Sequence, residues 1–290
     1  MLSALEKAKV LVEALPYLKN FDRKFMVVKV GGSTMTSPDE LRSLITDIVF
    51  MEQVGVWPIL VHGGGPAISA EMERAGLKPH FIRGRRVTDG AVLEIAHKVL
   101  IDRISSNVVE LIEAAGGKAV PLNGRGSNFL IAEKRLVDGD DLGFVGEVTE
   151  VDVELARRIS SGGVIPVVAP IGRDRSGQLF NINADSVAWH LAAQLKAEKL
   201  IFLSNVPGIL RDKDDPKTLI STCSIDGCRD LVKQGVIAGG MLPKIEACIS
   251  ALEGGCHSTH IISGLTMHTM LLEVFTPEGV GTKISVLGGK

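Results

Sequence analysis

Residues 25–33 read FMVVKVGGS, an apolar run that carries a single cation, Lys29, and passes directly into Gly31, Gly32 and Ser33. An apolar run of this length before paired glycines predicts a buried strand that enters a loop whose backbone amides can approach a ligand closely. Burying an ammonium is costly unless a carboxylate or a bound anion compensates its charge, so the stretch indicates an anion site at Lys29. The alternative is a lysine on an edge strand whose amine reaches solvent.

The composition of the 290-residue chain is that of a globular protein with one large α/β domain or two lobes, because 45% of its residues are hydrophobic and 23% are charged. The formal net charge of -2 provides no overall field to recruit nucleic acid or a membrane surface. No apolar run reaches the roughly 18 residues of a membrane span, and acidic residues among the N-terminal lysines argue against a signal peptide. We therefore expect a protein of the cytoplasm, or of an organelle stroma after processing, without nucleic-acid or membrane partners.

The four cysteines lie in the last quarter of the chain and form no C-x-x-C pair, which argues against a zinc site and a disulfide framework. No set of His, Cys and Asp residues has the spacing of metal ligands, so we expect no metal site built from protein residues. The cysteines are expected to be core thiols: Cys223, Cys228, Cys248 and Cys256.

A second apolar strand, residues 57–61, runs into a second glycine loop, residues 62–66 (HGGGP). Three glycines before a proline at a helix start leave amides exposed for phosphate or carboxylate oxygens, although a purely structural turn is the alternative. Strands and helices continue to alternate along the chain, and residues 128–137 and 144–151 have the pattern of a β-hairpin. This order predicts an open, mainly parallel sheet with helices on both faces.

Three further clusters of polar residues follow. The arginines of residues 83–86 (RGRR) suit bidentate recognition of a carboxylate, although such a cluster is also common in solvated loops. Asn181, Asn183 and Asp185 crowd the expected start of a helix, where capping explains only one of them. Lys244 follows a double glycine, which places a second lysine beside a glycine loop in the other half of the chain.

Two glycine loops, two lysines and a carboxylate together favour phosphoryl transfer, a reaction in which catalysis is mostly positioning and neutralisation of charge on the transferring group. The P-loop and dinucleotide-binding motifs are both missing. The G-x-S-x-G motif of hydrolases is missing as well.

The motifs VKVGGS, VHGGGP, RVTD, DLGFVGEV, NINAD, GGMLPK and the tail HTMLLEVF…GVGT, taken together and in this order, resemble the acetylglutamate kinases of the amino-acid-kinase family, in their long, arginine-sensitive form. The resemblance covers nearly the whole chain. It implies the carbamate-kinase-like α/β fold in two lobes. Residues 1–22 would form a helix for oligomerisation and regulation, residues 23–195 the acetylglutamate lobe, and residues 196–290 the ATP lobe with parts of an arginine site.

The resemblance also implies roles for individual residues. Lys29 and Lys244 would stabilise the transferring phosphoryl group from opposite sides, and Asp185 would hold both lysines in position. Gly31 and Gly32 would bind phosphate. The implied site for N-acetyl-L-glutamate comprises Gly64, Gly65, Arg86, Asn181 and Asn183. The implied nucleotide site comprises Ser204, Asn205, Gly208, Leu210, Gly239 and Gly240.

The implied reaction is attack by the γ-carboxylate of N-acetyl-L-glutamate on the γ-phosphate of ATP, with Mg²⁺ held largely by the phosphates and water. Feedback inhibition by arginine and a hexamer built as a trimer of dimers are also implied, and a PII signalling protein is a candidate partner. The implied arginine pocket comprises Tyr17, Lys199, His268, Glu273 and Gly281.

The chain departs from the family pattern at Asn205, where many relatives have an aspartate, and at Arg83, where a small or amide residue is expected. Two rival hypotheses stay open. One is another amino-acid kinase that acts on glutamate, aspartate, carbamate or UMP. The other is a catalytically silent amino-acid sensor with the same fold, against which the intact Lys29, Asp185 and Lys244 argue.

Overall fold

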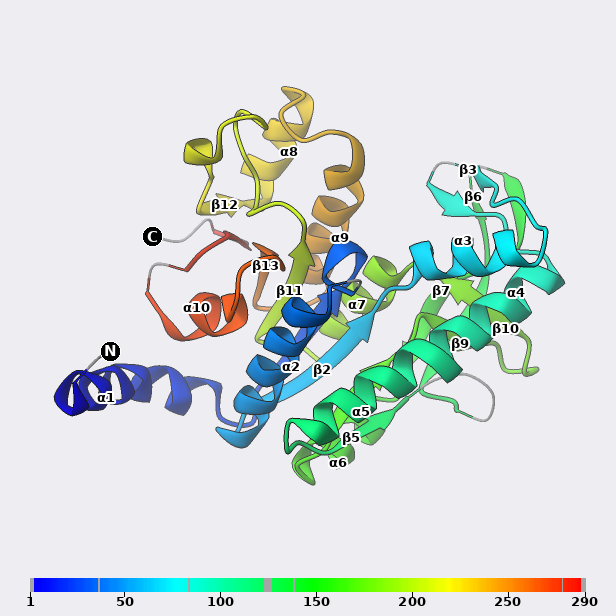
Figure 1. Ribbon diagram of the computed structural model, residues 1–290. Helices are drawn as coiled ribbons and strands as arrows, with labels where there is room; N and C mark the ends of the chain where they lie inside the picture. Colours follow the sequence, from blue (N-terminus) through cyan, green and yellow to red (C-terminus); the bar gives the residue numbers. More distant parts are fainter. Residues whose placement is uncertain are drawn as a thin grey trace.

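The computed structural model of the protein describes residues 3–35, 37–82, 84–122, 127–137, 139–277 and 279–287. Its centre is an eight-stranded sheet of order β12-β14-β13-β11-β1-β2-β8-β5 (Figure 1). All neighbouring strands of this sheet are parallel except β13 and β14, so the predicted mainly parallel sheet is confirmed. The strands are β1 (Phe25–Val30), β2 (Trp57–His62), β5 (Ala119–Pro121), β8 (Ile165–Val168), β11 (Lys199–Ser204), β12 (Thr222–Ser224), β13 (Ser258–Ser263) and β14 (Thr282–Ser285).

The opening stretch forms β1, whose six residues are all buried. Because side chains alternate along a strand, Phe25 and Val27 belong to one core and Met26, Val28 and Val30 to the other. The first core is covered by α6 (Val153–Ser161), α7 (Ala184–Gln194), α8 (Ile225–Lys233) and α9 (Leu242–Glu253). The second is covered by α1 (Ala4–Phe21), α2 (Pro38–Gln53), α5 (Ser106–Ala114) and α10 (Thr269–Phe275). Helices therefore cover both faces, as predicted.

A smaller closed sheet, of order β10-β7-β6-β9, lies beyond one side of the main sheet (Figure 1). Its strands are β6 (Leu130–Val137), β7 (Asp140–Val151), β9 (Ile171–Arg173) and β10 (Leu179–Ile182). The antiparallel pair β6 and β7 is the predicted hairpin. Strands β9 and β10 were not predicted, and Asn181 lies on β10 rather than at the start of a helix.

Residues 90–114 form one continuous helical segment of three parts. These are α4 (Gly90–His97), the π-helical η2 (Lys98–Ser105) and α5. The other short elements are the 3₁₀ turns η1 (Gly32–Met35), η3 (Pro216–Thr218) and η4 (Gly239–Met241), the helix α3 (Gly65–Arg74), and the paired strands β3 (Phe81–Ile82) and β4 (Arg85–Arg86).

The leading helix α1 begins at a capping box, in which the Ser3 hydroxyl and the Glu6 carboxylate each accept a hydrogen bond from the other's backbone amide. Pro16 lies inside this helix, which continues to Phe21. Its apolar side chains Leu5, Val10, Leu11, Val12 and Leu15 are exposed. Within the described part of the chain, helices are too short or too polar to cross a membrane.

Candidate active site

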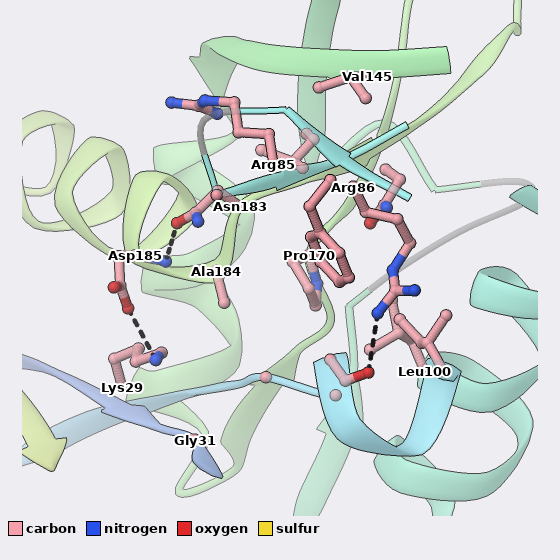
Figure 2. Close-up of a pocket in the computed structure, with 18 residues that line it drawn as sticks. Lys29, Gly31, Arg85, Arg86, Leu100, Val145, Pro170, Asn183, Ala184 and Asp185 are labelled. Atoms are coloured by element: carbon pink, nitrogen blue, oxygen red, sulfur yellow. Dashed lines mark hydrogen bonds and ion pairs between the residues drawn. The ribbon is translucent and has the colours of Figure 1, made fainter. Parts of the chain in front are cut away.

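Lys29, Asp185 and Lys244 meet at one point, although they come from three distant parts of the sequence. The Lys29 Nζ lies 2.7 Å from the Asp185 Oδ1, and the Lys244 Nζ lies 3.2 Å from the Asp185 Oδ2. Lys29 stands near the end of β1, Asp185 in the first turn of α7 and Lys244 in the first turn of α9. The structure thus provides the carboxylate that the charge of Lys29 requires (Figure 2).

The Asp185 carboxylate is ionised between the two ammonium groups. Burial alone would raise its pKa, but the charges of Lys29 and Lys244 outweigh burial, so the pKa lies below its ordinary value. The Asp185 side chain is 12% exposed and the Lys29 side chain 10%. Because the carboxylate carries one charge and the lysines two, the trio has one positive charge left to attract an anion.

The two glycine loops lie beside this trio. A Cβ at Gly31 would lie 2.7 Å from the Lys29 Nζ, so glycine is what lets the loop approach the amine. In the second loop, Gly64 precedes the first turn of α3, and a Cβ there would lie 2.5 Å from Leu100 and 2.9 Å from Ile104. The second loop is therefore seated against the π-helical segment, with its amides at a helix N-terminus that favours anions.

A cavity of about 220 Å³ lies between the two loops and the N-terminus of α7. Its size suits a small metabolite, since pockets for drug-sized ligands measure roughly 300–1,000 Å³. Several residues with predicted binding roles line it: Lys29, Gly31, Gly64, Gly65, Arg86, Asn181, Asn183 and Asp185. Arg83 lies outside the described residues.

Arg86 forms one wall of the cavity with a buried guanidinium. Its Nη2 donates hydrogen bonds to the Gly65 carbonyl at 3.0 Å and the Ser69 hydroxyl at 2.8 Å. Its Nη1 contacts the Met72 sulfur, and the guanidinium lies over the Phe81 ring, 4.7 Å from the centroid. No ion pair joins Arg86 to a carboxylate among the described residues, so its charge is available to a ligand.

The two asparagines differ in what they do. Asn183 is the N-cap of α7, and its Oδ1 accepts hydrogen bonds from the amides of Asp185 and Ser186. This cap fixes the turn that presents Asp185 to the lysines. Asn181 instead donates from Nδ2 to the Thr88 hydroxyl at 3.2 Å, which connects β10 to the loop after Arg86.

The residues that were predicted to bind the nucleotide do not line this cavity. Ser204 ends β11, Asn205 is exposed after it, and Gly208 is buried against Thr282, which a Cβ would approach to 2.4 Å. Leu210 forms an isolated β-bridge with Leu219. Gly239 and Gly240 are exposed in η4, directly before α9 and Lys244.

Some of the residues predicted to form the pocket for free arginine lie close together in the structure. They surround His260, a residue that was not singled out from the sequence. The His260 ring accepts from the Lys199 Nζ at 3.2 Å and lies 2.6 Å from the Glu273 Oε1. The other Glu273 oxygen accepts from the Val280 and Gly281 amides. Burial lowers the pKa of His260 to about 4, so its ring is neutral at pH 7.

The remaining two residues of that set lie apart from the cluster. Tyr17 packs on Phe21, with ring centroids 6.5 Å apart, and Phe21 in turn lies under the Lys199 amine. The His268 Nδ1 instead lies 2.7 Å from the Asp47 Oδ1 on α2.

The amino acid kinase family model matches residues 24–263, which is most of the chain. The chain belongs to this family. It is 47% identical to the acetylglutamate kinase of Heliobacterium modesticaldum over 98% of this chain and 99% of that protein. It is 46% identical to the acetylglutamate kinase of Desulforamulus reducens over the same shares. Membership of a kinase family implies ATP as the phosphoryl donor.

Among solved structures, the chain is similar to N-acetylglutamate synthase from Neisseria gonorrhoeae, with 29% identity and a TM-score of 0.86. The match covers 96% of this chain but only 63% of the synthase chain, in a structure with coenzyme A and N-acetyl-glutamate bound. A second structure of that synthase, with coenzyme A and L-arginine, matches with a TM-score of 0.83.

Two polar groupings near the cavity were missed from the sequence. The His62 Nδ1 lies 3.1 Å from the Gly63 carbonyl, and its Nε2 lies 2.7 Å from the Ser105 hydroxyl on η2. The carbonyl requires a proton on Nδ1, so Ser105 donates to Nε2 and the neutral ring ties the glycine loop to the π-helix. The second grouping surrounds Glu147 of β7, which contacts Arg135, Ser186 and His190.

The described residues contain no group of three or more His, Cys, Asp or Glu side chains that could hold a metal ion. Both oxygens of Asp185 face lysines and offer no free ligand. All four cysteines are free and buried.

Proposed function

We propose that the protein is an acetylglutamate kinase, which transfers the γ-phosphoryl group of ATP to the γ-carboxylate of N-acetyl-L-glutamate in arginine biosynthesis. The products are N-acetyl-L-glutamyl 5-phosphate and ADP. The observation that carries the proposal is the bridge from Lys29 through Asp185 to Lys244 beside two glycine loops. Relatives named acetylglutamate kinase, 44–47% identical over nearly the whole chain, support this choice within the family.

The chemistry needs no covalent enzyme intermediate and no general base, because a carboxylate nucleophile is already ionised at neutral pH. The substrate carboxylate attacks the γ-phosphorus in line, and charge develops on the transferring oxygens. Lys29 and Lys244 neutralise that charge from two sides. Asp185 keeps both amines in place, so little reorganisation is required at the transition state.

The cavity would hold N-acetyl-L-glutamate. Arg86 binds its α-carboxylate, since it is a buried guanidinium without a carboxylate partner among the described residues. The amides of Gly64 and Gly65 face the γ-carboxylate at the start of α3. Asn181 stabilises the cavity wall through its hydrogen bond to Thr88 and can also bind the substrate. Asn183 uses its side-chain oxygen as the helix cap, so its side-chain NH2 group remains to bind the substrate.

ATP would bind against the second half of the chain, at the C-terminal end of β11 and the start of α9. Residues 1–22, 23–195 and 196–290 then serve as the regulatory helix, the acetylglutamate lobe and the ATP lobe. Gly31 and Gly32 bind the transferred phosphate, and the predicted nucleotide contacts surround the rest of the molecule: Ser204, Asn205, Gly208, Leu210, Gly239 and Gly240. Mg²⁺ would be carried by the ATP phosphates and water, because the described residues offer no cage for it.

Arginine would act as a feedback inhibitor of this cytoplasmic pathway. A structure of the similar N-acetylglutamate synthase was solved with coenzyme A and L-arginine, and this likeness supports arginine as the ligand to test. The pocket would draw on Tyr17, Lys199, Glu273 and Gly281, with His268 at its margin. The exposed apolar side of α1 would join dimers into a hexamer, to which a PII protein could bind.

The proposal is tested by trapping the acyl phosphate with hydroxylamine and measuring ADP release, with ATP and each candidate acceptor. N-acetyl-L-glutamate should be fast, while L-glutamate, L-aspartate, carbamate and UMP should be slow. Arg86→Gln should raise the KM for N-acetyl-L-glutamate by roughly tenfold or more, because it removes a charged partner. Arg175→Gln is the control, since Arg175 is an exposed partner of Glu150. Fast turnover of another acceptor, or none with any, would refute the proposal.

A further inference from the structure

The peptide unit between Gly63 and Gly64, in the second glycine loop, is held by protein groups on its carbonyl side. The Gly63 carbonyl lies 3.1 Å from the Nδ1 of His62. The amide of Gly63 donates to the Val30 carbonyl at 2.8 Å, which fixes the loop to the end of β1. Both backbone polar groups of Gly63 are therefore engaged, and the ends of β1 and β2 set the course of the loop.

The ring of His62 is fixed in turn by the π-helical segment. His62 is the last residue of β2 and is fully buried. Its Nε2 lies 2.7 Å from the hydroxyl of Ser105, which is buried at the end of η2. Because Ser105 donates to Nε2, the proton of the neutral ring is on Nδ1 and is donated to the Gly63 carbonyl. π-Helical segments are rare and often occur at functional sites.

This contact decides where the next amide points. A trans peptide unit is planar, so its carbonyl and its N–H point in opposite directions. Because the Gly63 carbonyl faces His62, the Gly64 N–H points away from His62. Gly63 and Gly64 line the cavity, whereas His62 does not. Among the described residues the Gly64 amide has no hydrogen-bond acceptor, so it is available to a ligand.

The backbone alone would not fix this orientation. Glycine lacks a Cβ, so two successive glycines give the peptide unit between them wide conformational freedom. If the unit were reversed, the loop would present a carbonyl oxygen to the cavity and repel carboxylate and phosphate oxygens. Gly63 also packs on the first glycine loop, since a Cβ there would lie 3.6 Å from the Gly31 Cα. The orientation of one peptide unit therefore matters for the anion site as a whole.

We propose that His62 is a positioning residue for phosphoryl transfer, which turns the Gly64 amide toward the reacting oxygens by holding the Gly63 carbonyl. Ser105 supports it by keeping the ring in the required tautomer. The inference rests on the proposed kinase function, in which the Gly64 amide faces the γ-carboxylate of the acceptor. A preorganised amide stabilises the charge that develops there in the transition state. His62 touches no reacting atom and acts through the backbone.

Two substitutions separate the two contacts of the ring. In His62→Asn the side-chain amide nitrogen lies close to the position of Nδ1 and can still donate to the Gly63 carbonyl. In His62→Gln it lies close to the position of Nε2 and reaches Ser105 instead. His62→Gln should lower kcat by roughly tenfold or more, because the orientation of a transition-state donor is lost. His62→Asn should lower kcat by about threefold or less, because the bond to the carbonyl is kept.

The measurements are steady-state kinetics, with the acceptor that the parent protein phosphorylates, and chemical denaturation of each variant. His257→Gln is the control, because His257 is exposed. A merely structural role would make kcat follow stability, whereas the positioning role predicts that His62→Asn is faster than His62→Gln even at equal stability. Equal kcat values, or a faster His62→Gln, would overturn the inference.

Ser105→Ala is a second test and also serves if His62→Gln fails to fold. It should lower kcat by at least about threefold, because the ring loses the hydrogen bond that selects its tautomer. An unchanged kcat in this variant would contradict the role of the pair. A parent protein that is inactive with every acceptor would refute the kinase function and the inference with it. An active parent whose His62 variants do not differ would refute the inference alone.

Discussion

The Lys29 Nζ lies 2.7 Å from the Asp185 Oδ1, so the first strand of the sheet and the first turn of α7 meet in a buried ion pair. The second oxygen of the same carboxylate faces Lys244. One carboxylate therefore fixes two amines that originate in opposite halves of the chain. The distance between the amines is set by a rigid planar group rather than by two flexible side chains.

Lys29→Ala should reduce kcat by at least ~100-fold, because a preorganised charge at the transition state is removed. The matched control is Lys233→Ala, since Lys233 forms an exposed ion pair with Asp230 at 3.2 Å and does not line the cavity. The measurement is ADP release at saturating ATP and N-acetyl-L-glutamate. Normal turnover of Lys29→Ala would disprove the proposed mechanism.

Gly143→Ala should destabilise the protein and raise the KM for N-acetyl-L-glutamate. Gly143 has φ +78°, and a Cβ there would lie 2.2 Å from the Thr88 carbonyl oxygen, which accepts a hydrogen bond from the Phe144 amide. Displacing Thr88 would also disturb Asn181. We expect a loss of about 1–3 kcal/mol in the free energy of unfolding.

Gly139→Ala is the matched control for that change. Gly139 has φ +91°, and no described atom lies within 4 Å of its added Cβ. The Gly139→Ala variant therefore measures the cost of backbone strain without a steric clash like the one between residue 143 and Thr88. Chemical denaturation and steady-state kinetics of the two variants separate the effects. Equal KM values for both variants would mean that Thr88 does not position the substrate.

The histidine of the glycine loop should make stability depend on pH. Burial lowers the pKa of His62 to about 4, from 6.5 in the unfolded chain. Below pH 6.5 the unfolded state binds the additional proton, so the contribution of His62 is complete above that pH and is lost as the pH falls toward 4. The loss is roughly 3 kcal/mol.

Chemical denaturation at several pH values checks this expectation. His62→Gln should reduce the slope of the profile between pH 6.5 and 4, with the remainder due to His190 and His260, whose pKa values burial also lowers. His257→Gln should not reduce the slope, because His257 is exposed. An unchanged slope in His62→Gln would mean that other groups cause the pH dependence.

Much of this fold follows from local pattern. Long apolar runs such as residues 25–30 and 57–61 predicted the buried parallel strands, and glycine loops after them predicted where Lys29 and the cavity lie. The contact between Lys29 and Asp185 could be anticipated because a buried lysine requires a counterion. The family motifs then indicated which carboxylate it was.

Other features depend on tertiary contacts that have no local signal. Strand β10 holds only Leu179–Ile182, too few residues for alternation to distinguish a strand from a helix start. His260 meets Lys199 because the register pairs Lys199 with Ser258, which makes His260 a diagonal neighbour. The different directions of Arg85 and Arg86 in Figure 2 likewise appear only once β4 is formed.

Glu273→Gln should weaken inhibition by arginine at least ~10-fold and change kcat by less than about twofold, because a buried charged partner is lost away from the reacting atoms. Glu273 is the carboxylate that contacts the His260 ring in the cluster with Lys199, and so the group expected to bind a cationic ligand. Glu253→Gln is the control, since Glu253 forms an exposed ion pair with Arg229 at 2.6 Å. The measurement is turnover against arginine concentration, with the thermal unfolding midpoint recorded for each variant. Undiminished inhibition of Glu273→Gln would mean that arginine binds elsewhere. If millimolar arginine does not change the turnover of the unsubstituted protein, the proposal of feedback inhibition is wrong, whereas the kinase assignment is unaffected.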